Sequence, residues 1–248
     1  MSTSTGAVTA RLLDVWELGA TRPVTGRALA LLTAARPEAS PAELAALSIG
    51  RRDALLLELR TRVFGDRVVG LAGCTSCGEL LEVEFSGSDI TIAEPPPGPA
   101  EGCVLRAEPY EVRVRLLDSR DLAGIAHESA VPAARDALLR GCVLSASLDG
   151  REVPTSQLPD GVMDLVEQWL AAADPQADIR ISLRCPACAT AWQQSFDIVS
   201  FLWAEIDALA RRTLYDVHRL ATAYGWRESD ILAMSEPRRR VYLELVET

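Results

Sequence analysis

The stretch Val68-Val-Gly-Leu-Ala-Gly-Cys-Thr-Ser-Cys-Gly-Glu-Leu-Leu-Glu-Val-Glu-Phe85 decides the fold. After the Cys-x-x-Cys turn in this stretch, apolar and polar residues alternate, which is typical of half-buried β-strands. A second stretch, Ile179-Arg-Ile-Ser-Leu-Arg-Cys-Pro-Ala-Cys188, repeats the pattern and continues into a strand over residues 192–198. Each copy ends in an Asp-Ile pair, Asp89-Ile90 and Asp197-Ile198. The sequence therefore predicts two β-hairpins, each with a cysteine pair in its turn.

These cysteine pairs have the chemistry of a zinc site. A Cys-x-x-Cys turn places two thiolates on one side of a tight loop, and two such turns complete a tetrahedron of sulfur around zinc. The pairs of an ordinary ribbon are about 15–20 residues apart, whereas positions 77 and 185 are separated by 108. The insertion is acceptable because loop-closure entropy grows only logarithmically with length. We therefore predict one structural Zn²⁺ held by Cys74, Cys77, Cys185 and Cys188.

Three other interpretations of the cysteine pairs stay open. A redox-active pair needs the N-terminus of a helix to lower its thiol pKa, but both pairs lie between predicted strands. A catalytic zinc keeps one ligand position open, and two cysteine pairs fill all four positions. The third interpretation is that the cysteines are reduced and metal-free. The two remaining cysteines, Cys103 and Cys142, are expected to be buried thiols with a packing role.

The rest of the chain has mainly helical periodicity. Expected helices cover residues 10–18, 26–35, 42–47, 50–63, 119–128, 132–142, 160–173, 201–224, 229–234 and the end from Pro237, and strands are expected at 110–116 and from Cys103. Ser40-Pro41 is a helix start signal, and Gly65 and Gly225 are stop signals.

The helix predicted at residues 50–63 illustrates the expected packing. Leu55, Leu56 and Leu59 share one face of this helix, which we expect to be buried. Arg51, Arg52 and Arg60 lie outside that face and are expected to be exposed.

The predicted fold class is α+β: mostly helical, with a small antiparallel zinc-ribbon centre formed by the two distant hairpins. Five segments follow, namely an N-terminal helical region (1–66), the first zinc-ribbon hairpin (67–93), an inserted mixed α/β segment (94–177), the second zinc-ribbon hairpin (178–198) and a C-terminal helical region (199–248). The inserted segment opens with a proline-rich run, residues 94–102, that cannot form regular hydrogen-bonded structure.

Composition limits the classes of partner. The net charge is −10, from 25 Lys and Arg against 35 Asp and Glu, which disfavours binding to nucleic acid. The apolar runs are far shorter than the roughly 20 residues that cross a bilayer. The N-terminus has no positive region followed by an apolar core, which argues against a secretory signal. We expect a cytoplasmic protein without membrane contact, in which cysteines ligate a metal rather than form disulfides.

No catalytic constellation is visible. The chain has no phosphate-binding glycine loop and no nucleophile elbow. Its two histidines, His127 and His218, stand apart from any serine or cysteine motif and are expected to serve packing. We therefore predict no catalytic residues and a protein that is not an enzyme.

The order of the pieces is similar to a known family. The relevant segments are Ser48-Ile-Gly-Arg-Arg-Asp-Ala-Leu-Leu-Leu-Glu-Leu-Arg60, Cys74-Thr-Ser-Cys77-Gly-Glu79, Arg115-Leu-Leu-Asp-Ser-Arg-Asp-Leu122, Cys185-Pro-Ala-Cys188, Phe201-Leu-Trp203, Val217-His-Arg-Leu-Ala-Thr-Ala-Tyr-Gly-Trp226 and Arg238-Arg-Arg-Val-Tyr242. Together they resemble the baseplate hub and assembly protein family of T-even-like phages, and its relatives in bacterial phage-tail-like contractile injection systems.

The resemblance implies a non-enzymatic, zinc-stabilised assembly factor or baseplate component whose partners are other baseplate and tail proteins. It leaves open whether the chain stays in the finished particle or acts only during assembly. Trp203, Tyr224, Trp226 and Tyr242 are then either anchors at an interface or core residues beneath the long helix. The alternative function is a zinc-ribbon protein that binds nucleic acid or assists transcription.

Overall fold

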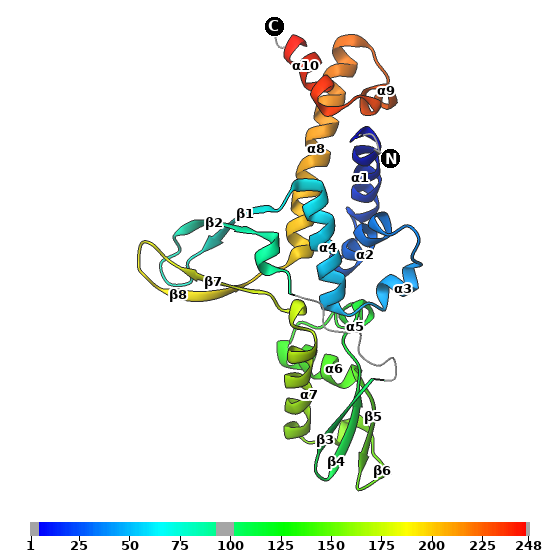
Figure 1. Cartoon of the computed structure of the whole chain (residues 1–248), viewed down its shortest axis with the longest axis vertical. Coiled ribbons are helices and arrows are strands. Elements are labelled where there is room, and N and C mark those ends of the chain that lie inside the picture. Colours follow the sequence, from blue (N-terminus) through cyan, green and yellow to red (C-terminus); the bar gives the residue numbers. More distant parts are fainter. Residues whose placement is uncertain (1–4, 93–101, 247–248) are drawn as a thin grey trace. The chain divides into compact units, whose positions relative to one another are not determined.

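Helical residues make up more than half of the part of the chain that the structure describes, and the strands form separate antiparallel sheets (Figure 1). The computed structural model describes residues 5–92 and 102–246. The predicted α+β class is confirmed, with its small antiparallel hairpins and its distant cysteine pairs brought together. The predicted proline-rich run lies outside the described residues, apart from Gly102.

The chain separates into two compact units. The first comprises the residues up to Glu38 together with those from Val199 onward, and the second runs from Ala39 to Ile198. The division into five segments is a finer description than this, and it stays a prediction.

The first unit is helical. It contains α1 (Thr5–Gly19), α2 (Val24–Ala35), most of α8 (Ile198–Tyr224), α9 (Glu228–Ala233) and α10 (Glu236–Val246). Trp16 Nε1 on α1 donates a hydrogen bond to Asp207 Oδ1 on α8 at 2.7 Å. Gly225, with a positive φ of 67°, ends α8 as predicted.

The aromatic residues of this unit pack against their own chain. Trp203 is buried, with 8% of its surface exposed. Tyr224 stacks on Trp226 with ring centroids 4.5 Å apart, and Trp226 meets Tyr242 edge-on at 4.9 Å. Trp226 and Tyr242 border the small core formed by Val217, Leu220 and Ile231. These contacts favour the core interpretation for Trp203, Trp226 and Tyr242, whereas Tyr224 is 39% exposed.

The second unit begins with α3 (Pro41–Ala45) and α4 (Ile49–Phe64). Ser40 caps α3 as predicted, because its side chain accepts a hydrogen bond from the Glu43 N–H while the Glu43 carboxylate accepts one from the Ser40 N–H. The start of α4 lies against Asp174, whose carboxylate accepts a 2.9 Å hydrogen bond from the Gly50 N–H. A Cβ at position 50 would lie 2.0 Å from Asp174 Oδ1, so this approach requires glycine.

The prediction for the arginines of α4 was wrong at two positions. Arg52 and Arg60 are buried, with exposed fractions of 5% and 3%. A buried guanidinium needs polar partners. Arg60 Nη1 donates to the carbonyl oxygens of Gly65 at 2.8 Å and Asp66 at 3.3 Å, beyond the end of the helix. Arg52 Nε lies 2.7 Å from Asp53 Oδ1.

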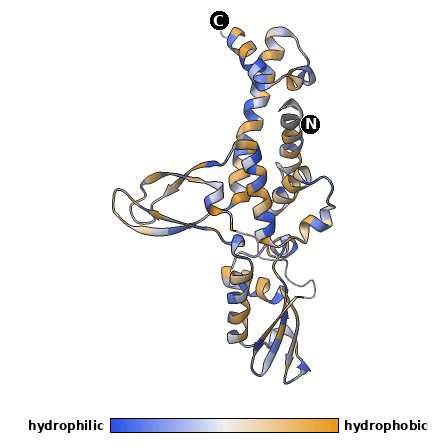
Figure 2. Cartoon of the chain, viewed as in Figure 1, coloured by the Kyte–Doolittle hydropathy of each residue, from blue (hydrophilic) through white to orange (hydrophobic). Residues whose placement is uncertain are grey.

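Two hairpins follow the predicted pattern. The first pairs β1 (Arg67–Gly73) with β2 (Leu80–Ser86) and leads into the 3-10 turn η1 (Gly87–Ile90), and the second pairs β7 (Arg180–Arg184) with β8 (Ala191–Ser195). In β2 and β7 hydrophobic and hydrophilic residues alternate (Figure 2). We call β1–β2 and β7–β8 together the paired hairpins.

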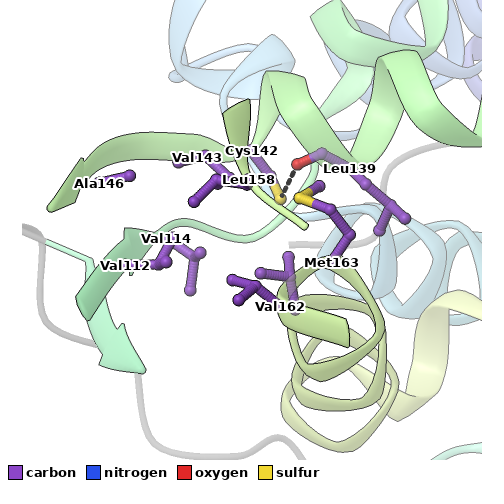
Figure 3. Packing of buried hydrophobic residues seen from close by; sticks show 10 residues of the cluster. Val112, Val114, Leu139, Cys142, Val143, Ala146, Leu158, Val162 and Met163 are labelled. Carbon is purple, nitrogen blue, oxygen red and sulfur yellow. Dashed lines mark hydrogen bonds between the residues drawn. The ribbon is translucent and has the colours of Figure 1, made fainter. Parts of the chain in front are cut away.

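The inserted segment has its own sheet and core. The strands β3 (Cys103–Ala107), β4 (Tyr110–Val114), β5 (Val143–Leu148) and β6 (Arg151–Glu152) form one antiparallel sheet in that order. The helical elements are α5 (Ser119–Gly124), α6 (Val131–Gly141), η2 (Thr155–Gln157), α7 (Asp160–Ala173) and η3 (Pro175–Ala177). Side chains from β4, β5, α6 and α7, including Val112, Val143 and Met163, form a buried apolar cluster (Figure 3).

The sequence-based prediction omitted β5 and β6 and made α5 too long. β5 directly follows α6, and its serines and alanine give it little apolar contrast. A local signal for the turn is present in Asp149-Gly150, a dipeptide that favours two-residue hairpin turns. Both residues have a positive φ, 50° and 78°, and Leu148 pairs with Arg151 across them.

Across the described ranges, 5–92 and 102–246, no helix combines the length and the apolar character needed to span a membrane.

Candidate metal centre

The two cysteine turns of the second unit face one another. The Sγ atoms of Cys74, Cys77, Cys185 and Cys188 all lie within 4.8 Å of each other. Two of the inter-hairpin Sγ–Sγ distances are 3.6 Å, for Cys74–Cys188 and for Cys77–Cys185. The structure thus brings together the four predicted residues from two hairpins that are distant in sequence.

Both turns have the same backbone geometry. The N–H of Cys74 donates to the Glu79 carbonyl at 2.8 Å, and the N–H of Cys185 donates to the Thr190 carbonyl at 2.9 Å. In each turn the fourth residue after the first cysteine donates back to that cysteine's carbonyl at 3.0 Å. This fourth residue has a positive φ in both turns, 76° at Gly78 and 61° at Ala189. The internal repeat seen in the sequence is therefore a repeat of backbone conformation.

The spacing of the sulfur atoms fits a metal ion better than a disulfide. A disulfide joins sulfur atoms about 2.05 Å apart, and all four cysteines are free thiols. Four sulfurs placed tetrahedrally at about 2.3 Å from zinc would be about 3.8 Å from one another. The observed separations, from 3.6 Å to at most 4.8 Å, are close to this value. The donor set and its spacing therefore fit a four-coordinate thiophilic ion.

Neighbouring groups shift the pKa values of Cys188 and Cys77 in opposite directions. Hydrogen bonds with the side chain and backbone of Thr190 lower the pKa of Cys188 to about 6. Hydrogen bonding with the Glu79 backbone lowers the pKa of Cys77, but the nearby Cys188 and Cys185 thiols outweigh it and raise that pKa to about 12. Four thiolates so close together repel one another, so a bound cation is needed to keep all of them ionised.

The two hairpins also meet away from their turns. At their base Phe85 and Phe196 meet edge-on, with ring centroids 5.5 Å apart. No strand residue of β7 or β8 is fully buried. On the outer face of the first hairpin Leu71 and Leu80 are 75% and 69% exposed. The cysteine cluster is thus the main connection between the turns.

The other candidate residues lie apart from this cluster. Cys142 is fully buried as predicted; burial raises the pKa of its thiol to about 11, and its Sγ lies 3.0 Å from the Leu139 carbonyl oxygen (Figure 3). Cys103 is only half-buried, at the edge of the same core. His127 and His218 are both exposed, so of the two packing roles expected, core or surface, only the surface one applies.

Comparison with known proteins supports the resemblance seen in the sequence. Residues 33–203 match the model of a family described as T4 bacteriophage base plate protein. The match covers more than half of the chain, including the whole second unit. Segments 217–226 and 238–242, which contributed to the sequence resemblance, lie outside it. Comparisons with curated proteins and with solved structures gave no match.

The matched region contains both hairpins, all four clustered cysteines and the inserted segment between them. The chain belongs to the T4 bacteriophage base plate protein family.

Proposed function

We propose that this protein is a non-enzymatic, zinc-stabilised assembly factor or baseplate component of a phage-tail-like contractile injection system. The observation that carries the proposal is the family match over residues 33–203. Its partners are then other baseplate and tail proteins. The proposal includes a cytoplasmic location, in keeping with six free cysteines, and incorporation into a tail-like particle.

The proposed metal is one structural zinc ion held by Cys74, Cys77, Cys185 and Cys188. Support comes from the four-sulfur donor set and its spacing. When bound, zinc supplies coordination energy that fixes the two turns together. Four cysteines leave no ligand position for a substrate or an activated water, and this closed set supports a structural role.

The nucleic-acid alternative has weaker support. A ribbon that binds phosphate backbones needs a basic face. The first hairpin instead exposes Glu79, Glu82 and Glu84 near its turn. The overall charge of −10 also disfavours binding to phosphate backbones. Arg180 and Arg184 are exposed on the second hairpin, but Arg180 is already paired with Asp178 at 2.7 Å.

The test is a gentle affinity purification of the tagged chain from its native cell, with mass spectrometry of the partners and zinc counted in the same eluate. We expect sheath, tube or baseplate proteins and about one zinc per chain. Recovery of RNA polymerase or nucleic acid without tail proteins would contradict the assembly role. Recovery of tail proteins with a metal-free chain would contradict only the zinc assignment.

A further inference from the structure

An open cavity of about 820 Å³ lies in the second unit, away from the cysteine cluster. Its walls come from the residues that leave the first hairpin, from α5, α6 and α7, and from the residues that enter the second hairpin. The lining is mainly apolar and includes Ile90, Ile92, Leu122, Leu138, Leu170 and Ile179. Cavities of roughly 300–1,000 Å³ can enclose a drug-sized ligand, so this one is large enough for several side chains of a partner.

Charged side chains also line this cavity. They are two arginines and four carboxylates: Arg135, Arg180, Asp89, Glu167, Asp174 and Asp178. Both arginines are engaged within the chain, since Arg135 Nε lies 3.1 Å from Glu167 and Arg180 lies 2.7 Å from Asp178. Two carboxylates, Asp89 and Asp174, remain in excess over the arginines. They accept hydrogen bonds from the backbone N–H groups of Ser86 and Gly50, which are neutral donors, so the lining carries net negative charge.

This arrangement favours a protein segment over a small polar ligand. A small-molecule site usually has a few polar groups inside the pocket that orient the ligand. Here most of the lining is apolar and every polar residue in it is charged, a composition that suits a protein segment with apolar anchors. An amphipathic helix that enters a groove uses apolar anchors at helical spacing, and a lining with net negative charge complements basic residues beside those anchors.

We propose that this cavity docks an amphipathic helix of another baseplate protein, with apolar anchors flanked by Lys or Arg. The inference rests on the proposed function only for the identity of the partner. Ala171 on α7 lines the cavity and is exposed, so a larger side chain there fills the space. Its neighbour Ala172 is equally exposed on the same helix but does not line the cavity.

The direct test uses two fluorescein-labelled peptides of about 14 residues with the same leucine pattern, one with Lys and one with Glu at the polar positions. We expect the Leu/Lys peptide to bind the full chain, measured by fluorescence anisotropy, and the Leu/Glu peptide to bind at least about tenfold more weakly. Ala171→Trp should weaken Leu/Lys binding by about tenfold or more, and Ala172→Trp should leave it unchanged. Equal affinity of the two variants, or of the two peptides, would overturn the proposal.

A second variant changes another lining residue in case Ala171→Trp does not fold. Ile92 is 38% exposed, so Ile92→Ser removes apolar surface from the cavity without burying a polar group. We expect about fivefold weaker binding of the Leu/Lys peptide, with circular dichroism and zinc content unchanged. Unaltered binding would contradict the proposal.

Affinity purification of the same variants separates this inference from the proposed function. If the wild-type chain brings down tail proteins, Ala171→Trp should lose one of them while Ala172→Trp keeps them all. Tail proteins that stay with both variants would refute the docking site and leave the assembly role intact. Peptide binding that depends on Ala171, in a chain that recovers no tail proteins, would refute the assembly role and support the docking site.

Discussion

The paired hairpins and the inserted segment belong to the same unit but are held together in different ways. The inserted segment has a buried cluster of apolar side chains in which Val112, Val114 and Val166 are at most 1% exposed. Among the strand residues of the hairpins only Val68 and Ala72 are buried, and the turns meet through four sulfur atoms. The difference indicates that the inserted segment is stabilised by burial of apolar surface, and that the hairpins depend on the proposed metal.

The largest effect that can test this comparison is loss of the metal. A structural zinc site contributes on the order of 10 kcal/mol to folding, so chelation, or the change Cys77→Ser, should release the hairpins from each other. We expect hydrogen exchange, followed by mass spectrometry, to speed up in β1–β2 and β7–β8 while amides of β4 and α7 stay protected. Cys103→Ser, outside the cluster, is the matched control and should change neither zinc content nor exchange. Equal loss of protection in both regions would contradict the comparison.

The converse change removes part of the apolar core. Met163 on α7 is 4% exposed within the cluster (Figure 3), and truncation of such a side chain costs about 2–5 kcal/mol. Met163→Ala should therefore speed up exchange in β3–β6 and α7 while zinc content stays at the wild-type value. Met163→Leu nearly conserves volume and should cost less than about 1.5 kcal/mol. Loss of zinc in Met163→Ala but not in Met163→Leu would show that the inserted segment and the paired hairpins fold as one.

A smaller effect is expected at Asp118, inside the inserted segment. This carboxylate is 3% exposed, caps α5 by accepting from the Arg120 N–H at 2.8 Å, and lies 2.5 Å from the Arg120 guanidinium. Burial raises its pKa, but the Arg120 hydrogen bonds outweigh burial and hold the pKa below its usual value. Asp118→Asn should lower the free energy of unfolding by about 1–2 kcal/mol at pH 7.

The stability difference between the wild-type chain and Asp118→Asn should depend on pH, and the direction of this dependence follows from the depressed pKa of Asp118. A depressed carboxyl pKa contributes stability above the unfolded-state value of about 3.9, and this contribution is lost as pH falls through the folded pKa. The advantage of the wild-type chain over Asp118→Asn in urea unfolding should therefore shrink below about pH 4. A difference that grows on acidification would contradict the assigned ion pair.

The smallest effect concerns the two turns themselves. Ala189 has the left-handed conformation that Gly78 has in the first turn, and an L-residue there costs about 1 kcal/mol. Gly78→Ala should weaken zinc binding about fivefold and Ala189→Gly should strengthen it by a similar factor, in chelator competition. A Cβ at Gly78 meets no atom within 4 Å, so steric clash does not complicate the comparison. Stronger zinc binding by Gly78→Ala, or weaker binding by Ala189→Gly, would contradict the equivalence of the two turns.

Local signals in the sequence are sufficient to predict the hairpins and most helices. The Cys-x-x-Cys spacing and strand alternation predict the two hairpins, because tight turns and period-two strands are local properties. The preference of zinc for four sulfur ligands then predicts that Cys74, Cys77, Cys185 and Cys188 form one cluster. The burial of Arg52 and Arg60 does not follow from such signals because it depends on their hydrogen-bond partners, which for Arg60 are carbonyl groups beyond the helix end.

The cavity of the second unit also could not be predicted. Its walls bring together residues as distant as Ile92 and Ile179, and no local pattern indicates that these approach one another. The strand β5 escaped prediction for a different reason. Its turn residues Asp149-Gly150 carry a local signal, but the strand itself has little apolar contrast.

The most direct test of the proposed metal centre is X-ray absorption at the zinc edge, together with metal counting, on the purified chain. A closed four-cysteine site predicts about one zinc per chain and a single shell of four sulfur atoms at about 2.3 Å. A chain without zinc, or zinc with nitrogen or oxygen among its nearest ligands, would contradict the claim that Cys74, Cys77, Cys185 and Cys188 hold the two hairpins together through one metal ion.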